Sequence, residues 1–347
     1  MLAMRLFGRK SEPVEPGALI ADFWTWWHEA RPRVDALVDA GDAGELAELV
    51  GPAVNALDES LIWEVAPGLA AKHALVVSAA GNPELRSFAH RWALAAPEAD
   101  GRWEFHPSRQ ANPQAHDLTV DVGGHQFGMD RFVLGVRVPP GTPRVNVSAY
   151  HPIFQDIDDE TRMETTLLAL DWLLGEDEVA RWIGDIVASE FEPIDAIAAI
   201  HLPGVVADVA QGFPGNRWAR LEGQTGTGKP LTAIARYPLR PVDYPLYDQH
   251  IALTVTYRHR DPDGLPTPEA ESTLTTFETH LTSALTDSAV LAAHLTTEGT
   301  RTYHIYADPT ANLTPTLKPL TTSWPEGRPH LTTTPDPSWS SVAPFLT

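Results

Sequence analysis

The stretch that decides the fold class is residues 251–307, IALTVTYRHRDPDGLPTPEAESTLTTFETHLTSALTDSAVLAAHLTTEGTRTYHIYA. Its first segment, Ile251–Tyr257, alternates apolar and polar residues with the period of two that a half-buried β-strand requires. Glu269–Leu285 then follows a helical period, and Val290–Leu295 and Tyr303–Ala307 return to a strand pattern. The stretch therefore predicts strand, helix, strand, strand.

Two further elements complete this C-terminal unit. Asn312–Trp324 predicts a helix despite its prolines, and a last strand surrounds His330–Thr333. The order β-α-β-β-α-β is the ferredoxin-like one. Residues 19–105 predict a similar order, with two helices, a hairpin over 61–78, a helix from Asn82 to about Ala96 and the strand Trp103–Phe105. We consider the two as related half-units, with chance agreement of short elements as the alternative.

The whole chain is predicted to be α+β, with two or three small antiparallel-sheet units that carry helices on one face. Between the end units we expect strands at 132–138, 145–150 and 183–187 and helices at 158–174 and 194–210. Pro139-Pro140 and Pro214-Gly215 are the clearest breaks. The expected parts are a flexible leader (1–17), an N-terminal α+β domain (18–113), a middle α+β domain with an acidic helix (114–215) and a C-terminal ferredoxin-like domain (216–347).

Composition excludes several classes of function. The 347 residues are 43% hydrophobic and contain no cysteine, so disulfides, thiol nucleophiles and thiolate-bound metals are excluded. No apolar run approaches about 18 residues, and no signal peptide is recognisable, so we expect a cytoplasmic protein without a membrane partner. The net charge of −21 disfavours nucleic acid as a partner.

Negative charge is concentrated between Gln155 and Asp195. This segment has 13 acidic residues and two arginines, 13 − 2 = 11 net negative charges. One interpretation is a solvated acidic helix face. The other is a docking surface for a basic protein.

Cofactor and metal motifs are not recognisable. The 14 histidines include no His-Glu-x-x-His pair, and His250 and His259 fall at opposite ends of one predicted strand, too far apart to share a metal. Asp261–Gly264 fits a β-turn better than a calcium loop. We therefore expect no cofactor, no metal and no catalytic residue that the sequence alone identifies.

The candidate binding residues come from a repeated phrase, Trp63-Glu64-Val65 and Trp103-Glu104-Phe105-His106, the second of which continues to Arg109. In a strand, each tryptophan faces opposite to the glutamate that follows it. The simpler interpretation puts indoles in a core and carboxylates in solvent. The functional alternative is a shared polar groove, for which the candidate residues are Glu64, Trp103, Glu104, His106 and Arg109.

These phrases, together with Phe23-Trp24-x-Trp26-Trp27, Leu75–Asn82 and Gly264-x-Pro266, resemble an uncharacterised bacterial family, domain of unknown function 695. The resemblance covers most of residues 19–340. It implies no established activity. Members of that family in turn are similar to regulator of ribonuclease activity B, a small α+β protein that inhibits an enzyme by binding it, which implies a protein partner.

Two functions remain open. The leading hypothesis is a non-enzymatic protein-binding or regulatory module. The alternative is a hydrolase-type enzyme whose histidine and carboxylate site is assembled only in three dimensions, around Glu64, Glu104 and His106.

Residues 223–230, GQTGTGKP, match the Walker A spacing at both outer glycines and at Lys229. A P-loop needs a Ser or Thr after the lysine to bind magnesium, and this chain has Pro230 there. Leu231–Tyr237 alternates like a strand, not a helix. We therefore predict an exposed turn between antiparallel strands at 218–221 and 231–237.

Replacement of this lysine tests the prediction. Because the Lys229 side chain is expected to lie in solvent, Lys229→Ala should leave the unfolding transition unchanged. Equilibrium dialysis with ATP and GTP should detect no magnesium-dependent binding. Saturable nucleotide binding that disappears in Lys229→Ala would contradict this interpretation.

Overall fold

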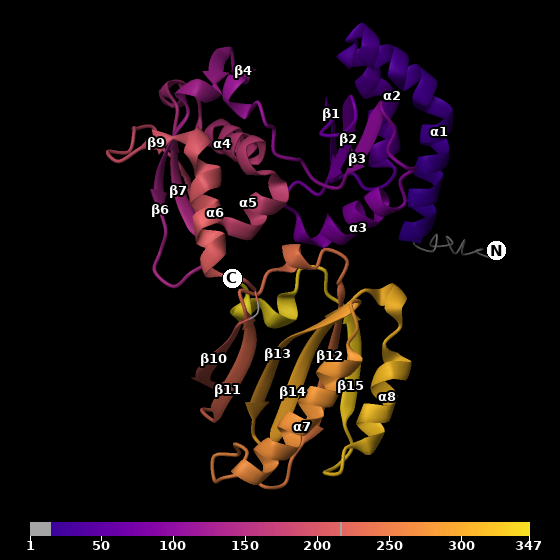
Figure 1. Cartoon of the computed structure of the whole chain (residues 1–347), viewed down its shortest axis with the longest axis vertical. Coiled ribbons are helices and arrows are strands. Elements are labelled where there is room, and N and C mark those ends of the chain that lie inside the picture. Colours follow the sequence, from indigo (N-terminus) through magenta and orange to yellow (C-terminus); the bar gives the residue numbers. More distant parts are fainter. Residues whose placement is uncertain (1–14, 216) are drawn as a thin grey trace, which may run out of the picture. The chain divides into compact units, whose positions relative to one another are not determined.

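The computed structural model describes residues 15–215 and 217–347 (Figure 1). The leader predicted over 1–17 lies, up to residue 14, outside the described residues, and the first helix begins at Pro16. The chain separates into two compact units. One contains the chain up to Ala79 with Phe88–Pro107, and the other contains Ala80–Ser87 with Ser108–Thr347.

Up to residue 107 the strands form one three-stranded sheet, in the order β1-β2-β3. The elements are α1 (Pro16–Ala40), α2 (Ala43–Asn55), β1 (Ile62–Pro67), β2 (His73–Ser78), α3 (Pro83–Leu94) and β3 (Trp103–His106). The predicted β1–β2 hairpin is confirmed. The prediction of a purely antiparallel sheet is wrong, because α3 carries the chain back across the sheet and β3 pairs with β2 in parallel.

Aromatic side chains make the core of this unit. Trp27 of α1 meets Trp103 of β3 edge to face, with 5.2 Å between ring centroids, and Trp24 stacks on Trp92 at 4.8 Å. Trp27, Trp92 and Trp103 are all fully buried. Helix and sheet are therefore joined mainly by indole contacts.

The middle part of the chain has its own sheet, ordered β8-β7-β6-β9, and a separate β4–β5 hairpin that the sequence analysis missed. Its elements are β4 (Thr119–Val122), β5 (His125–Gly128), β6 (Val133–Arg137), β7 (Val145–Tyr150), α4 (Asp159–Leu174), α5 (Glu176–Trp182), β8 (Ile183–Ala188), β9 (Ile197–Ala198) and α6 (Leu202–Gly212). β7 and β8 are parallel because α4 and α5 connect them, which again corrects the antiparallel prediction. The helix predicted from Ile194 begins only at Leu202, because β9 first pairs with β6.

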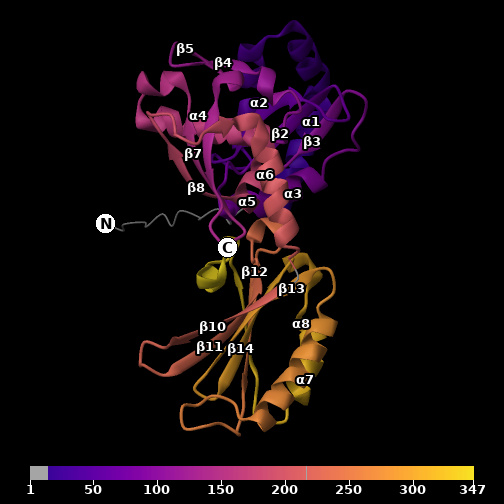
Figure 2. The same ribbon diagram turned by 60° about the vertical axis from the view of Figure 1, so that its left-hand side comes forward.

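The C-terminal part is one six-stranded antiparallel sheet, in the order β10-β11-β13-β14-β12-β15 (Figure 1). Its elements are β10 (Arg217–Gln224), β11 (Pro230–Tyr237), β12 (Gln249–Thr256), α7 (Pro268–Ala284), β13 (Ala289–Thr297), β14 (Thr300–Ala307), α8 (Thr314–Ser323) and β15 (His330–Pro335). From β12 onward the element order is the predicted β-α-β-β-α-β. Leu274 of α7, Leu317 of α8 and Leu253 of β12 share one core, so both helices cover the same face of the sheet (Figure 2).

The suspected half-units agree in element order and differ in pairing. In the N-terminal sheet β3 lies directly beside β2, whereas in the C-terminal sheet β12 lies between β14 and β15. A shared order of elements therefore does not give the two sheets a shared topology.

The glycine-rich segment forms the turn expected of it. β10 and β11 pair antiparallel from Arg217↔Tyr237 to Gln224↔Pro230, and the Thr225 N–H donates to the Lys229 carbonyl at 2.8 Å. Gly228 has φ +79°, which a side chain would disfavour. Lys229 is exposed, so the predicted hairpin is confirmed.

Among the described residues, no helix is long and apolar enough to cross a membrane. The same residues contain no group of three or more His, Asp or Glu side chains placed to hold a metal ion.

Because α7 and the sheet share one core, a cavity made in that core should lower the free energy of unfolding substantially. Leu274 is fully buried, so Leu274→Ala should lower the free energy of unfolding by about 2–5 kcal/mol. Leu221→Ala is the control, because Leu221 is 39% exposed on β10, and its effect should stay within about 0.5 kcal/mol. Denaturant titration measures both; equal effects would refute the assigned core.

Candidate functional site

The structure brings together two of the five predicted site residues. Glu104 and His106 lie on β3, and His106 Nε2 is 2.9 Å from Glu104 Oε1. Glu64 lies in register with Val76, which is in register with His106, so Glu64 faces the same side of the sheet two strands away, at about 10 Å. Trp103 is fully buried on the opposite face. Arg109 belongs to the other compact unit, where it pairs with Asp171 at 2.7 Å.

The Glu104 carboxylate is hydrogen-bonded to backbone N–H groups. It accepts hydrogen bonds from the N–H groups of Leu69, Ala70 and Ala71, at 2.6, 2.8 and 2.9 Å. Burial opposes ionisation, but the hydrogen bonds from His106 and these three amides outweigh it and lower the pKa of Glu104 to about 2. We interpret Glu104 as the anchor of the loop between β1 and β2.

The acidic segment makes several contacts within its own unit. Asp158 accepts from the Thr161 N–H at 2.9 Å and so caps α4. Arg162 pairs with Glu190 at 2.8 Å. Part of the concentrated charge therefore holds helix ends and connections in place.

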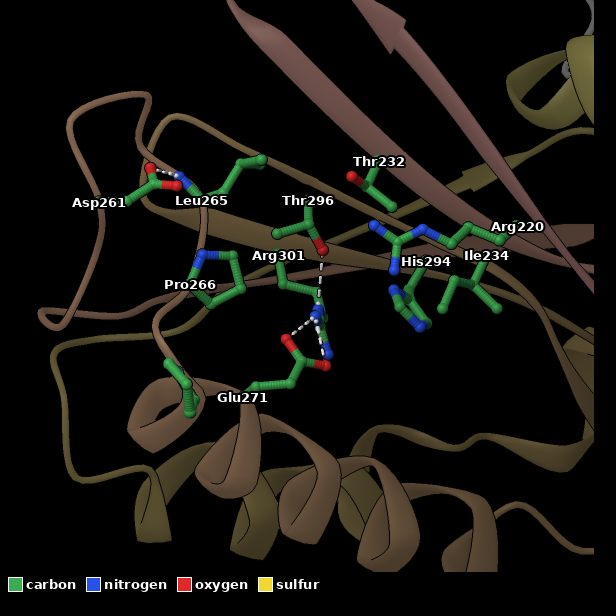
Figure 3. Close-up of a pocket in the computed structure, with 11 residues that line it drawn as sticks. Arg220, Thr232, Ile234, Asp261, Leu265, Pro266, Glu271, His294, Thr296 and Arg301 are labelled. Carbon is green, nitrogen blue, oxygen red and sulfur yellow. Dashed lines mark hydrogen bonds and ion pairs between the residues drawn. The ribbon is translucent and has the colours of Figure 1, made fainter.

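A more promising site lies in the C-terminal sheet, where a pocket of about 420 Å³ opens beside α7 (Figure 3). Its floor comes from neighbouring strands and its wall from the start of α7 and the preceding turn. The lining residues are Arg220, Thr232, Ile234, Asp261, Leu265, Pro266, Pro268, Glu271, His294, Thr296 and Arg301.

Sheet register explains why the floor is polar. Thr232 of β11 pairs with Thr296 of β13, which pairs with Arg301 of β14. In the adjacent row Arg220 pairs with Ile234, which pairs with His294. Residues directly opposite each other point to the same face, so both rows point toward α7.

Arg301 is the fixed cation of the pocket. The residue is only 4% exposed, and its guanidinium donates to both oxygens of Glu271, at 3.0 and 2.8 Å, and to Thr296 Oγ1, at 2.8 Å (Figure 3). Both bonds to Glu271 come from Nη2 and the bond to Thr296 comes from Nε, so two nitrogens are held and the guanidinium plane is fixed. Glu271 lies in the first turn of α7, so the pair also links the helix to β14.

His294 is the buried imidazole of the pocket. Its Nε2 lies 3.3 Å from Glu278 Oε2, and its Nδ1 is buried without a hydrogen-bond partner among the described residues. Burial and the nearby Arg301 lower the pKa of His294 to about 3, and burial raises the pKa of Glu278. The ring is therefore neutral at pH 7. A base of such low pKa abstracts protons poorly, so this pair favours recognition over acid–base catalysis.

Sequence reasoning missed this pocket because its members lie on four strands, one helix and the turn 261–266. The available signal was the pattern of β13, where polar residues at alternate positions, His294 and Thr296, follow the apolar run Ala289–Ala293. Polar residues at period two opposite an amphipathic helix indicate a face that the helix does not fully cover.

Fold and pocket together define an α+β domain with a polar site on the part of its sheet that lies beside α7. Residues 238–347 match the model of the Family of unknown function (DUF695), so this part of the chain is a DUF695 domain. The match covers about a third of the chain and confirms the predicted resemblance there; the phrases around Trp24, Leu75 and Trp103 lie outside it.

No curated protein and no solved structure matches the chain. The comparisons give no support for the resemblance to regulator of ribonuclease activity B.

The anchoring role of Glu104 predicts a pH-dependent stability. Since its folded pKa of about 2 lies below the ordinary value of 4.5, its ionised form stabilises the fold above about pH 5, and this contribution is lost as the pH falls toward 2. Glu104→Gln should lower the free energy of unfolding at pH 7 by about 1–3 kcal/mol, and the difference from the wild type should shrink toward pH 2. Denaturant titration followed by tryptophan fluorescence measures it.

Glu98→Gln serves as the control, since Glu98 is exposed in the same unit and its change should stay within about 0.5 kcal/mol at every pH. A Glu104→Gln protein as stable as the wild type at pH 7 would rule out the anchoring role.

Proposed function

We propose that this chain is a non-enzymatic protein-binding module that pairs an extended segment of another protein with the free edge of β10. The observation that carries the proposal is the exposure of that strand. Seven of the eight residues of β10 are exposed, and it is the terminal strand of its sheet. An exposed edge strand offers a row of backbone donors and acceptors to a second chain.

Hydrogen-bond alternation identifies which backbone groups are available. The Thr225 N–H donates to Lys229, so the pair 225/229 is hydrogen-bonded and every second residue of β10 directs its N–H and C=O away from β11. Glu222 and Arg220 are two of these residues. Their side chains lie on the same face as the pocket, so a bound segment would run alongside it.

Charge favours an acidic segment. Within a chain of net charge −21, the hairpin 217–237 contains Arg217, Arg220, Lys229 and Arg236 against Glu222, 4 − 1 = 3 net positive charges. Complementary charge accelerates association and disfavours wrong partners. We place recognition here and not on the acidic segment 155–195, whose carboxylates in part have partners of their own.

The proposal extends to the fold of the C-terminal part. The strand order β13-β14-β12-β15 with antiparallel neighbours, and two helices on one face, supports a ferredoxin-like core to which the β10–β11 hairpin adds two strands. The middle and C-terminal parts belong to one compact unit, but each has its own core, which supports a further division into three domains with boundaries near 113 and 215.

A matched pair of variants separates backbone pairing from side-chain contact. Peptides that bind the full chain would first be selected from a displayed library of random sequences. Glu222→Pro removes an outward N–H group without breaking the β10–β11 ladder. It should therefore lower the affinity for a selected peptide about tenfold or more. Glu222→Ala removes only the side chain and should leave the affinity equal or slightly higher. Fluorescence anisotropy with labelled peptide measures both, and circular dichroism checks the fold.

Two outcomes would refute strand addition: a library that yields no saturable binder, or a binder that the Glu222→Pro protein holds as tightly as the wild type does.

A further inference from the structure

We propose that the pocket beside α7 binds a neutral, hydroxyl-rich small molecule of the sugar or polyol class, held by His294, Arg301 and the side chains around them. This ligand is distinct from the peptide segment proposed for β10, and neither proposal depends on the other. The inference rests on the size of the pocket, on an unpaired buried atom and on its balance of charge.

The pocket has the dimensions of a small-molecule site. Its volume of about 420 Å³ falls within the range typical for such ligands. It lies within one sheet and its covering helix, and its members come from β10, β11, β13, β14, the turn 261–266 and α7 (Figure 3).

The decisive atom is His294 Nδ1. His294 is 3% exposed, and its Nε2 faces the Glu278 carboxylate, which only accepts hydrogen bonds, so Nε2 carries the hydrogen. Nδ1 is then an acceptor, and it has no partner in residues 15–215 or 217–347. A buried acceptor without a donor is costly, so a ligand that displaces the atoms covering Nδ1 and offers a hydroxyl group there gains that hydrogen bond.

Charge within the lining is balanced. Arg220 and Arg301 contribute two positive charges, Asp261 and Glu271 two negative ones, 2 − 2 = 0. Glu271 already neutralises Arg301, so a ligand charge of either sign would meet as much repulsion as attraction and would lose its hydration on entering. A neutral ligand loses less hydration and needs no opposite charge from the lining.

Donors and acceptors are interleaved around the pocket. The guanidinium groups only donate, Nδ1 and the carboxylates only accept, and the hydroxyls of Thr232 and Thr296 do both. A ligand hydroxyl also donates and accepts, so several hydroxyls on one small frame fit such a lining. Ile234, Leu265 and Pro266 add the apolar contact that the C–H faces of a sugar ring need.

The test uses the full chain and ligand-observed NMR followed by calorimetry. The panel contains neutral mono- and disaccharides and linear polyols, the phosphorylated and carboxylated forms of the same sugars, and amides of single amino acids. We expect saturable binding of at least one neutral member, with its charged counterpart about tenfold weaker or more. The ¹⁵N resonance of His294 Nδ1 should shift when that ligand binds, because Nδ1 gains a hydrogen bond.

Three variants locate the ligand. Thr232→Val keeps the side-chain shape and removes a hydroxyl, and Arg220→Ala removes an exposed guanidinium, so each should weaken binding about fivefold or more. Arg217→Ala is the matched control, because Arg217 lies on the same strand outside the lining, and it should leave the affinity unchanged. Thermal unfolding of all three should resemble that of the wild type.

The proposal is overturned if only a charged or amide ligand binds, if none binds saturably, or if bound sugar leaves the His294 resonance and the variants unaffected. Peptide capture by β10 is measured separately with Glu222→Pro, so failure of one proposal is distinguishable from failure of the other.

Discussion

The position of β12 between β14 and β15 is the constraint on which the C-terminal architecture depends. Because β12 pairs on both sides, α7 and α8 must each cross the sheet before the chain can add its next strand. Both helices then pack over the apolar residues of β12 and β14, among them Leu253 and Ile305. In this position the two helices do not cover the polar residues of β11 and β13. The pocket lies over these residues, beside the start of α7.

Local patterns gave most of the elements, since periodicity is a property of neighbouring residues. The hairpins 62–78 and 217–237 and helices such as α4 and α7 lie within a few residues of their predicted bounds. Parallel pairing of β2 with β3 and of β7 with β8 was missed, because it depends on how a crossover helix packs and not on the strands themselves.

The site was far less predictable than the fold. Glu104 was a candidate binding residue because the sequence does not reveal the backbone amides of residues 69–71, which donate hydrogen bonds to its carboxylate. His294 and Arg301 were not predicted as site residues, because the sequence of a strand does not show its partners on other elements. In the fold His294 lies beside Glu278, and Arg301 pairs with Glu271. Burial changes the chemistry of such groups, and burial is a long-range property.

The arginines of β10 have a further consequence for the behaviour of the chain in concentrated solution. An exposed strand that displays Trp218 and Leu221 could pair with the same strand of another molecule and begin aggregation. Antiparallel pairing centred on Arg220 would place its guanidinium opposite that of the second copy, and like-charge repulsion opposes that register. In other registers the net positive charge of the hairpin 217–237 still disfavours the approach of a second copy, while it favours a partner of opposite charge.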